Sequence, residues 1–332
     1  MASPRIFAIL GSTGNQGGSI ANTFLGEPGW QVRALTRNTS SPKAQALTAR
    51  GAEVVYVDIN KPETFPAAFE GASAIFAVTD FWGIYGDPAN QDKPKPGQPL
   101  NAWAGEFETQ QLKSIIDAVA KVPTLERFIL SSLSNVTKWS KGKYTHVYHF
   151  DSKANATEYG RKMYPDLWTK TSIFQSGYFL SNYVSNPITQ ASKNDEGVVQ
   201  FIGHIEPDVK IPFIAAEEDT GPIVKRLIDE SAGKNVIGYR EWLTVPELAL
   251  SFTKATGMKA ESVTLPKGEF HIPLPDELKL ELEENFAAFN EFGYESRDDP
   301  TVVHPQDLES PPSLDTVENY WKKQDWSKIF GA

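Results

Sequence analysis

The first half of the chain alternates short apolar runs with segments whose apolar residues recur at helical spacing. The apolar runs predict strands over residues 6–10, 29–37, 53–58, 74–78, 127–131 and 168–174. Helices are expected after residue 17 and over residues 61–69, 106–121 and 152–163. Strands that alternate with right-handed crossover helices predict an α/β fold, with a doubly wound parallel sheet covered on both faces.

The pattern becomes less regular after Gly177. Strands are expected near residues 198–205, 235–239 and 261–265, and helices near residues 222–231, 246–256 and 276–289. A chain of 332 residues exceeds the size at which a single core stops growing. We therefore expect a doubly wound domain over residues 1–175 and a smaller α+β substrate domain over residues 176–332. The chain near residues 235–256 is expected to return to the first domain.

A long segment without clear periodicity separates the fourth predicted strand from its helix. It covers residues 82–103 and is rich in proline, glycine and lysine. A connection of this length exceeds what a simple crossover needs, and such loops often cover a site. We expect it to be a loop that acts as a lid.

Three glycines follow the first predicted strand with the spacing GxxGxxG. Gly11 permits a tight turn, Gly14 lets the backbone approach a pyrophosphate, and Gly17 lets the helix lie against the strand. Such a turn can be purely structural, but an apolar strand precedes this one and a helix with one apolar face follows it. The sequence therefore predicts a dinucleotide site at a helix N-terminus. The expected ligands in the turn are Gly11, Thr13, Gly14, Asn15, Gln16 and Gly17.

The end of the second predicted strand indicates which dinucleotide binds. An NAD site usually presents a carboxylate to the ribose 2′-OH there, whereas this chain has Thr36, Arg37 and Asn38. A guanidinium pairs bidentately with a 2′-phosphate and stacks on adenine. Arg37 can also be an ordinary solvated charge. Because the glycine turn fixes its register, we predict that Arg37 binds NADP(H).

Composition excludes several other classes of function. The net charge of −10 and the pI of about 5.1 argue against nucleic acid as the ligand. Cysteine is absent, which removes disulfides and thiolate chemistry, and the five histidines show no metal-ligand spacing, so no metal is expected. No apolar run is long enough to span a bilayer, and no targeting segment is expected before Arg5. We expect a cytoplasmic protein without a membrane partner.

The helix after the fifth predicted strand carries the candidate catalytic residues. In short-chain dehydrogenases a serine ends this strand and a Tyr-x-x-x-Lys pair follows, in which lysine holds the nicotinamide ribose and tyrosine moves a proton. This chain has Ser131 and Lys153, but His149 stands at the tyrosine position. Tyr148 is one residue out of register, about a hundred degrees away on a helix. His149 either moves a proton or only lines the site, and both alternatives stay open.

The chain resembles the NmrA-like family of the fungal type, an atypical branch of the short-chain dehydrogenases. The resemblance covers nearly the whole chain. It is carried by residues 11–17, 34–38 and 78–82, Gln111, and residues 149–153, 211–213 and 219–221. It implies a Rossmann domain, a smaller C-terminal domain and a cleft for NADP(H) or NAD between them. Some members of the family sense cofactor redox state, and others reduce small molecules.

The resemblance also implies roles for further residues. Asp58 and Ile59 match the position that caps adenine, and Thr79 matches the strand edge along the ribose. The segment Gln175-Ser-Gly-Tyr-Phe179 is expected beside the nicotinamide, although Ser176 stands where many relatives have proline. The remaining cofactor ligands expected from the family are Lys153, Gln175, Gly177 and Tyr178. The expected substrate pocket consists of Phe81, Trp82, Tyr148 and Phe179.

Two functions of different class follow from these expectations. The first is an NADP(H)-dependent enzyme that reduces a C=C, C=N or C=O bond of a bulky apolar molecule, such as a secondary metabolite, with or without cyclisation. The number of aromatic residues that the chain places near the expected cleft favours this enzyme. The second is a redox sensor that binds NADP(H) without turnover and acts through a protein partner. The missing tyrosine and the acidic net charge favour the sensor. Of the two functions, we favour the enzyme.

Overall fold

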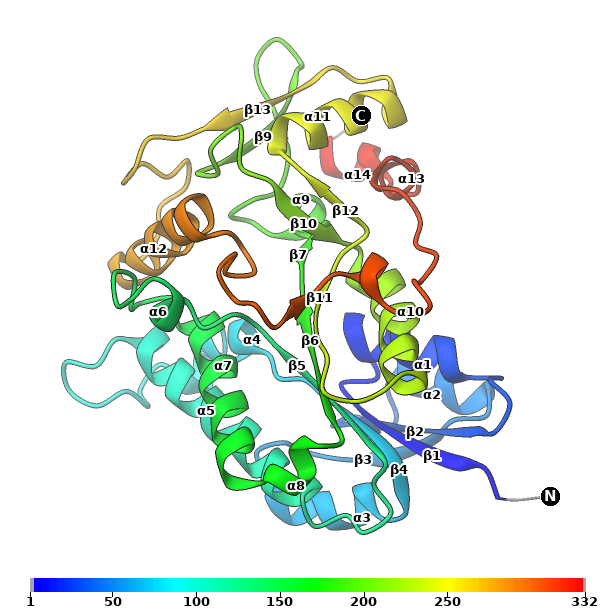
Figure 1. Cartoon of the computed structure of the whole chain (residues 1–332). Helices are drawn as coiled ribbons and strands as arrows, with labels where there is room; N and C mark the ends of the chain where they lie inside the picture. Colours follow the sequence, from blue (N-terminus) through cyan, green and yellow to red (C-terminus); the bar gives the residue numbers. More distant parts are fainter. Residues whose placement is uncertain (1–2, 331–332) are drawn as a thin grey trace.

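The computed structural model describes residues 3–330 and consists of two parts, one stacked on the other (Figure 1). The larger part is built on eight strands in the order β14-β11-β6-β5-β4-β1-β2-β3, and every pairing is parallel. The strands are β1 (Arg5–Leu10), β2 (Trp30–Thr36), β3 (Glu53–Tyr56), β4 (Ala72–Ala77), β5 (Arg127–Ser132), β6 (Thr171–Ser176), β11 (Asn235–Gly238) and β14 (Val302–Val303). The predicted doubly wound α/β fold is confirmed.

Helices cover both faces of this sheet because alternate strand residues point to opposite sides. Phe7 and Ile9 pack toward one face, and Ala8 and Leu10 toward the other. The helices of the first face are α1 (Asn15–Phe24), α2 (Pro42–Ala49) and α10 (Ala216–Asp229). Those of the second face are α3 (Phe65–Phe69), α5 (Leu100–Val119) and α7 (Tyr148–Met163). Both faces are apolar, as a buried parallel sheet requires.

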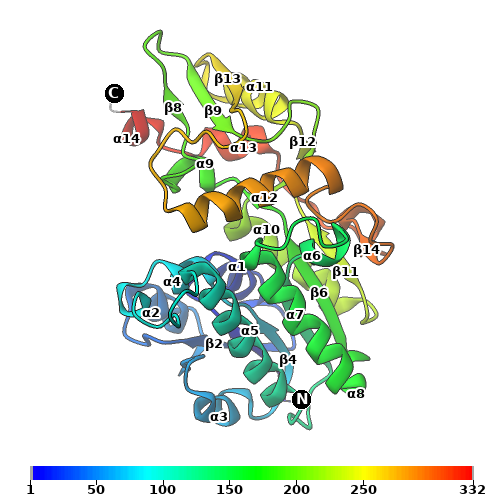
Figure 2. The same ribbon diagram turned by 90° about the vertical axis from the view of Figure 1, so that its left-hand side faces the viewer.

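The smaller part has two three-stranded sheets and its own hydrophobic core. One sheet contains β7 (Tyr178–Phe179), β10 (Ile211–Ile214) and β12 (Glu241–Leu243); the other contains β8 (Ser192–Lys193), β9 (Val199–Gly203) and β13 (Ala260–Thr264). Its helices are α9 (Asn182–Ser185), α11 (Val245–Thr256), α12 (Asp276–Phe292), α13 (Val317–Lys322) and α14 (Trp326–Phe330). Phe201, Phe252 and Trp321 lie in its core. Figure 2 shows α12 lying between the two parts.

Several predicted elements begin elsewhere than expected. The strand expected from residue 168 begins at Thr171, because α8 (Pro165–Trp168) precedes it. Helix α10 begins at Ala216, so Pro222 lies inside it rather than at its start. The segment 82–103 is not wholly a loop, because it contains most of α4 (Phe81–Tyr85) and the first turn of α5. Helix α6 (Val136–Trp139) was not expected at all.

Among residues 3–330, no helix combines the length and the apolar composition needed to cross a membrane.

The strand order reverses between β1 and β4, which are neighbours in the sheet. In open α/β sheets, ligands bind outside the carboxyl ends of the strands at such a switch point. The glycine turn follows β1 directly and is therefore at this place.

Candidate functional site

A cavity of about 720 Å³ lies at the carboxyl ends of the central strands, between the two parts of the molecule. Its walls include the glycine turn, the ends of β2, β4, β5 and β6, and side chains of α4, α7 and α12. Small-molecule and cofactor sites commonly have volumes of roughly 300 to 1,000 Å³. The volume of the cavity therefore lies within the range that is usual for such sites.

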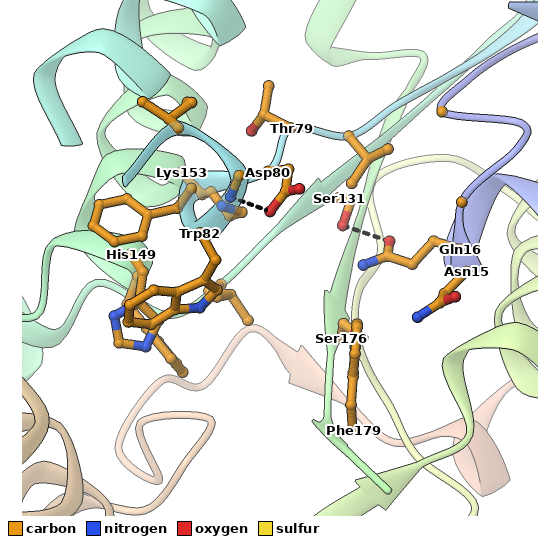
Figure 3. Close-up of a pocket in the computed structure, with 18 of the residues that line it drawn as sticks. Asn15, Gln16, Thr79, Asp80, Trp82, Ser131, His149, Lys153, Ser176 and Phe179 are labelled. Atoms are coloured by element: carbon orange, nitrogen blue, oxygen red, sulfur yellow. Dashed lines mark hydrogen bonds between the residues drawn. The ribbon is translucent and has the colours of Figure 1, made fainter. Parts of the chain in front are cut away.

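The glycine turn forms one end of the cavity, and all six residues predicted there line it. Gly11 has φ +66°, and its carbonyl accepts a hydrogen bond from the Gly14 amide at 2.8 Å. A Cβ at Gly17 would lie 2.4 Å from the carbonyl oxygen of Gly11. Helix α1 begins at Asn15, so the unpaired N–H groups of its first turn face the cavity. In Figure 3, Gln16 accepts a hydrogen bond of 2.8 Å from Ser131 at the end of β5.

Arg37 follows β2 and lies exposed at the edge of the cavity. It forms no ion pair with any residue between positions 3 and 330. Lys43 lies nearby, because its ammonium group donates to the backbone carbonyl of Thr13 at 3.2 Å. Two cations therefore border the turn at the place where a ribose 2′-substituent is expected.

The predicted adenine wall is only partly placed at the cavity. Ile59 lines the cavity, but Asp58 does not, while Thr79, predicted along the ribose, also lines it. The Asp58 carboxylate instead accepts a hydrogen bond from the Asn60 amide at 3.0 Å. Asn60 lines the cavity itself, and its side-chain oxygen accepts from Gln111 Nε2 at 2.6 Å. The pair formed by Asn60 and Gln111 was not predicted to form this wall.

Lys153 reaches the cavity from α7, and a buried carboxylate neutralises its charge. Its Nζ forms an ion pair with Glu108 of α5, whose side chain is 0% exposed. Thr79 donates to the same Glu108 oxygen at 2.7 Å, and Ser152 donates to the other. Three donors thus satisfy Glu108, as a buried charge requires. The ammonium of Lys153 is fixed beside the strand edge along which the ribose is expected.

His149 lines the same cavity one turn before Lys153. Its Nδ1 lies 2.6 Å from a carboxylate oxygen of Glu281, a residue of α12 that is 0% exposed. The imidazole packs against the rings of Phe81, Trp82 and Phe150, with centroid distances of 5.8, 4.8 and 5.0 Å. The position that a tyrosine occupies in short-chain dehydrogenases thus holds an imidazole bound to a buried carboxylate.

The segment after β6 forms a backbone wall. Only glycine fits at position 177 in this wall, because a Cβ there would lie 2.3 Å from the carbonyl oxygen of Pro212. Ser176, Gly177 and Tyr178 line the cavity, but Gln175 does not, because its Nε2 donates to Asn235 at 2.8 Å. Burial raises the pKa of Tyr178 and of Tyr294 above the ordinary value of 10.0. Both phenols therefore lose their protons less readily than a free tyrosine does.

Aromatic and aliphatic side chains form the opposite end of the cavity. Phe81, Trp82 and Phe179 line it as predicted for a substrate pocket. Tyr148 does not line it, because it packs against α5 at Gly105, where an added Cβ would lie 3.1 Å from its own. Three residues of α12 complete this apolar end and were not predicted: Leu282, Phe286 and Phe289.

Sequence reasoning also missed the two carboxylates that bind the candidate catalytic residues. Glu108 lies on the same buried face of α5 as Leu112 and Ile115. Glu281 is next to the buried Leu282 on the acidic helix α12. A carboxylate on an apolar helix face is a detectable signal, because charged groups are rarely buried without a partner. The partner itself is not detectable, since it lies in a distant element.

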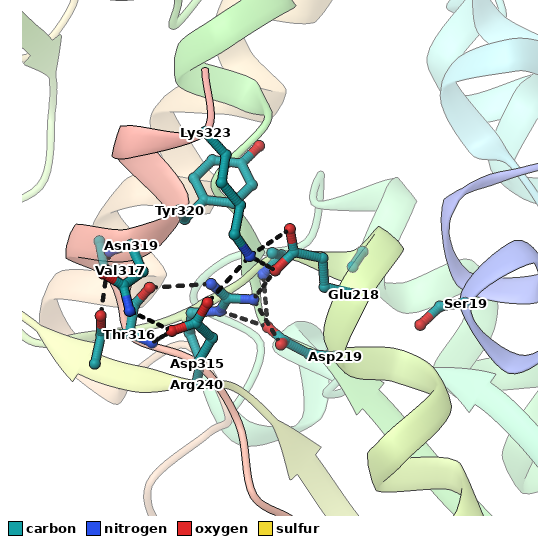
Figure 4. A network of polar contacts seen from close by, with 12 residues as sticks. Ser19, Glu218, Asp219, Arg240, Asp315, Thr316, Val317, Asn319, Tyr320 and Lys323 are labelled. Atoms are coloured by element: carbon teal, nitrogen blue, oxygen red, sulfur yellow. Dashed lines mark hydrogen bonds and ion pairs between the residues drawn. The ribbon is translucent and has the colours of Figure 1, made fainter. Parts of the chain in front are cut away.

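A second polar cluster lies outside the cavity and joins the two parts of the molecule (Figure 4). Arg240, between β11 and β12, is bound bidentately by Asp219 of α10, with distances of 2.7 and 2.8 Å. Its guanidinium also donates to Glu218 at 2.8 Å. Lys323, after α13, donates to Glu218 and to Asp315, each at 3.0 Å. The segment Asp219-Thr-Gly221, which helped to carry the family resemblance, therefore takes part in a structural contact between the two parts of the molecule.

The fold and the cavity define a Rossmann-type protein with a dinucleotide-type glycine turn. Within residues 3–330, no group of three or more His, Cys, Asp or Glu side chains is arranged to hold a metal. The chain belongs to the NmrA-like family, whose model matches residues 5–328.

Relatives of two kinds are similar to this chain. An NmrA-like family domain-containing oxidoreductase of Aspergillus hancockii is 29% identical over 298 residues, which cover 84% of this chain and 82% of the relative. The crystal structure of NmrA, a negative transcriptional regulator, in complex with NADP has a TM-score of 0.76 at 20% identity, covering 97% of this chain and 95% of that one. The Citrobacter sp. triphenylmethane reductase complexed with NADP(H) has a TM-score of 0.66 at 16% identity, covering 96% and 99%.

Proposed function

We propose that this protein is an NADP(H)-dependent oxidoreductase that reduces a C=C, C=N or C=O bond of a bulky apolar small molecule, of the kind made in fungal secondary metabolism. One observation carries the proposal: a single cavity joins the glycine turn, Arg37, Lys153, His149 and an apolar end. The name of the Aspergillus relative, an oxidoreductase, supports the reaction class. Ring closure coupled to the reduction belongs to the same proposal.

The residues of the cavity fit NADP(H). The close contact at Gly17 leaves no room for a side chain, so the turn offers bare backbone to a pyrophosphate. Arg37 has no carboxylate partner within residues 3–330, which suits a 2′-phosphate. The NADP complexes of NmrA and of the triphenylmethane reductase support this assignment. When bound, the cofactor supplies the hydride.

Lys153 and His149 would supply the electrostatics and the proton. The Lys153 ammonium is a hydrogen-bond donor for ribose hydroxyls, and its charge stabilises negative charge that develops on the substrate. Glu108 keeps this ammonium in place. The apolar end excludes water from the reacting bond and binds the body of the substrate. His149 is the proton donor in this proposal, because imidazole exchanges protons near neutral pH.

A second candidate function is cofactor sensing without turnover, in which the protein acts on a protein partner. The replacement of tyrosine by His149 favours it, as does the structural similarity to NmrA, a transcriptional regulator. The two functions differ in one measurable property, since only the enzyme consumes NADPH.

The test is NADPH oxidation with a panel of a quinone, a triphenylmethane dye and a cyclic imine, together with calorimetric binding of NADPH. We expect turnover with at least one probe, and we expect Lys153→Ala to lower it by about 10²-fold or more. NADPH binding without turnover of any probe, or of a fungal metabolite extract, would favour the sensor.

Lys153→Ala leaves Glu108 buried without its cation, so a folding defect can imitate a catalytic one. The double variant Lys153→Met/Glu108→Gln removes both charges and is the matched control. We expect it to fold, as judged by thermal unfolding, and to remain as inactive as Lys153→Ala. Full activity of this double variant would refute a catalytic role for Lys153.

A further inference from the structure

We infer that Glu281 is a positioning residue that holds His149 in the tautomer whose free nitrogen, Nε2, serves the cavity as the proton-transfer atom. The inference rests on the proposed function and extends it to the helix that carries Glu281. It assigns to α12, which belongs to the smaller part of the molecule, a direct influence on the chemistry at the Rossmann part.

The geometry around Glu281 fixes which nitrogen of His149 carries the hydrogen. One carboxylate oxygen lies 2.6 Å from Nδ1 and 3.1 Å from the backbone nitrogen of the same residue. The other oxygen accepts a hydrogen bond from Asn101 Nδ2 at 2.9 Å. An ionised carboxylate accepts hydrogen bonds only, so Nδ1 must be the donor. In the neutral ring Nε2 then carries no hydrogen and is free to exchange a proton.

The surroundings of the ring allow one orientation. Phe81, Trp82 and Phe150 surround it, and the side chain is only 11% exposed. No residue between positions 3 and 330 hydrogen-bonds to Nε2, although His149 lines the cavity. The ionisable groups that face the ring or share the beginning of its helix are Glu281 of α12, and Tyr148, Asp151 and Lys153 of α7. Of these, Glu281 alone contacts a ring nitrogen.

The proton step balances with the proposed reduction. Bound cofactor would supply a hydride to one end of the substrate double bond, so that negative charge would develop at the other end. The N–H bond at Nε2 of the imidazolium breaks, and its proton bonds to that second atom. The ring becomes neutral and retains the Nδ1 hydrogen bonded to Glu281. A proton from bulk solvent then reloads Nε2 through the mouth of the cavity, so the reduction consumes one solvent proton overall. The Glu281 carboxylate accepts the Nδ1 hydrogen throughout the step and so keeps the ring in one orientation.

The chain provides a matched control for this inference. Glu284 lies nearly one turn further along α12 and binds His146 Nδ1 at 2.8 Å, so it makes the same kind of contact. His146 does not line the cavity. A substitution of Glu284 therefore removes a carboxylate–imidazole contact between α12 and the residues just before α7, without touching the proposed proton path.

The test compares Glu281→Gln with Glu284→Gln. We expect Glu281→Gln to lower kcat by roughly 10- to 100-fold with an unchanged Kd for NADPH, and Glu281→Asp to restore part of the loss. Glu284→Gln is expected to keep the wild-type kcat. In the His149→Phe background Glu281→Gln should change kcat no further, because its effect acts through that ring. An equal loss in both backgrounds would overturn the inference.

A spectroscopic measurement keeps this test independent of turnover. Long-range ¹⁵N–¹H NMR distinguishes the two tautomers of a histidine, and the five histidines of the chain can be assigned with a His149→Phe variant. We expect His149 to be protonated at Nδ1 in the wild type and to lose this preference in Glu281→Gln but not in Glu284→Gln. An unchanged tautomer in Glu281→Gln overturns the inference, whether or not a substrate is found. Absence of turnover in the wild type with this tautomer present would refute only the proposed reaction.

Discussion

At the residue scale, the cofactor preference depends on the side chains that border the glycine turn. Arg37 is exposed and has no carboxylate partner within residues 3–330, so its charge is available to a ligand. Lys43 is held against Thr13 by a hydrogen bond of 3.2 Å and points a second positive charge toward the same region. A planar guanidinium binds phosphate through two parallel hydrogen bonds, whereas an ammonium acts as a point charge.

We therefore expect NADP(H) to bind more tightly than NAD(H), and Arg37→Ala to remove most of the difference. The loss of a charge-assisted contact to phosphate corresponds to about 1.5 to 3 kcal/mol, or roughly tenfold to a hundredfold in Kd. Calorimetry with both cofactors measures it, and Lys43→Ala is expected to have a smaller effect. Equal affinity of the wild type for the two cofactors would show that Arg37 does not select between them.

The residues of the site differed in how well the sequence predicted them. The glycine turn, Arg37 and Lys153 were recognisable because their chemistry depends on short spacing within one strand–turn–helix unit. Asp58, Tyr148 and Gln175 were predicted at the cavity, but they point elsewhere because side-chain direction depends on tertiary packing. Glu281 is 132 positions from its partner His149, a separation over which sequence spacing carries no information.

At the element scale, α1 and α10 pack closely because both helices have small side chains, Ser19 and Gly221, where they meet. The Gly221 amide donates to Ser19 Oγ at 2.9 Å. A Cβ at Gly221 would lie 2.4 Å from the Ser19 carbonyl oxygen and 2.1 Å from Thr23 Oγ1. The threonine can rotate away, but the backbone carbonyl cannot.

Gly221→Ala is therefore expected to lower the free energy of unfolding by about 1 to 3 kcal/mol through overpacking. Helix propensity alone would favour alanine by about 1 kcal/mol, so the sign of the change separates the two effects. Urea unfolding measures it. Gly203→Ala is the control, because nothing lies within 4 Å of a Cβ there. A Gly221→Ala variant as stable as the wild type would mean that the two helices can separate without loss.

The elements that the sequence predicted well are those that form because of the residue pattern within their own short segment. The β1–turn–α1 unit and the strands of the large sheet follow from apolar runs of ordinary length. Helix α10 was placed too late because Pro222 is typical of a first helical turn. The short strand β10 and helices α13 and α14 were not predicted, because their buried residues pack into the core of the smaller part rather than form a clear pattern of their own.

At the scale of the whole molecule, the two parts are joined through charges that are buried where they meet. The Arg240 side chain is 0% exposed and that of Asp219 is 3% exposed. Burial raises the pKa of Asp219 above its ordinary value of 3.8, and the Arg240 ion pair offsets this only partly. Burial also acts to raise the pKa of Glu218, but hydrogen bonds from Arg240 and Lys323 outweigh it and hold that pKa below 4.5.

We expect Arg240→Met to lower the free energy of unfolding by about 3 to 5 kcal/mol near neutral pH, because it leaves the Asp219 charge buried without a partner. A carboxyl whose folded pKa is raised is destabilising when ionised, and this cost disappears as falling pH protonates it. The loss should therefore be smaller at about pH 5 than at about pH 7. Urea unfolding at both values measures it.

The double variant Arg240→Met/Asp219→Asn is the control for this prediction. It removes both charges and should recover much of the stability lost in Arg240→Met at neutral pH. Neither variant replaces Lys323, which donates to Glu218 at 3.0 Å. A loss that is equal at both pH values, or that the double variant does not recover, would assign the effect to lost packing of the arginine stem instead.

Helix α12 presents two faces with different tasks. Leu282, Phe286 and Phe289 line the apolar end of the cavity, whereas Glu281 binds His149 in α7 and Glu284 binds His146 just before α7. The three apolar positions can therefore be exchanged without loss of the carboxylates. If the proposed function holds, evolution could change the shape of the accepted molecule through these three positions while the contact between Glu281 and His149 is inherited unchanged.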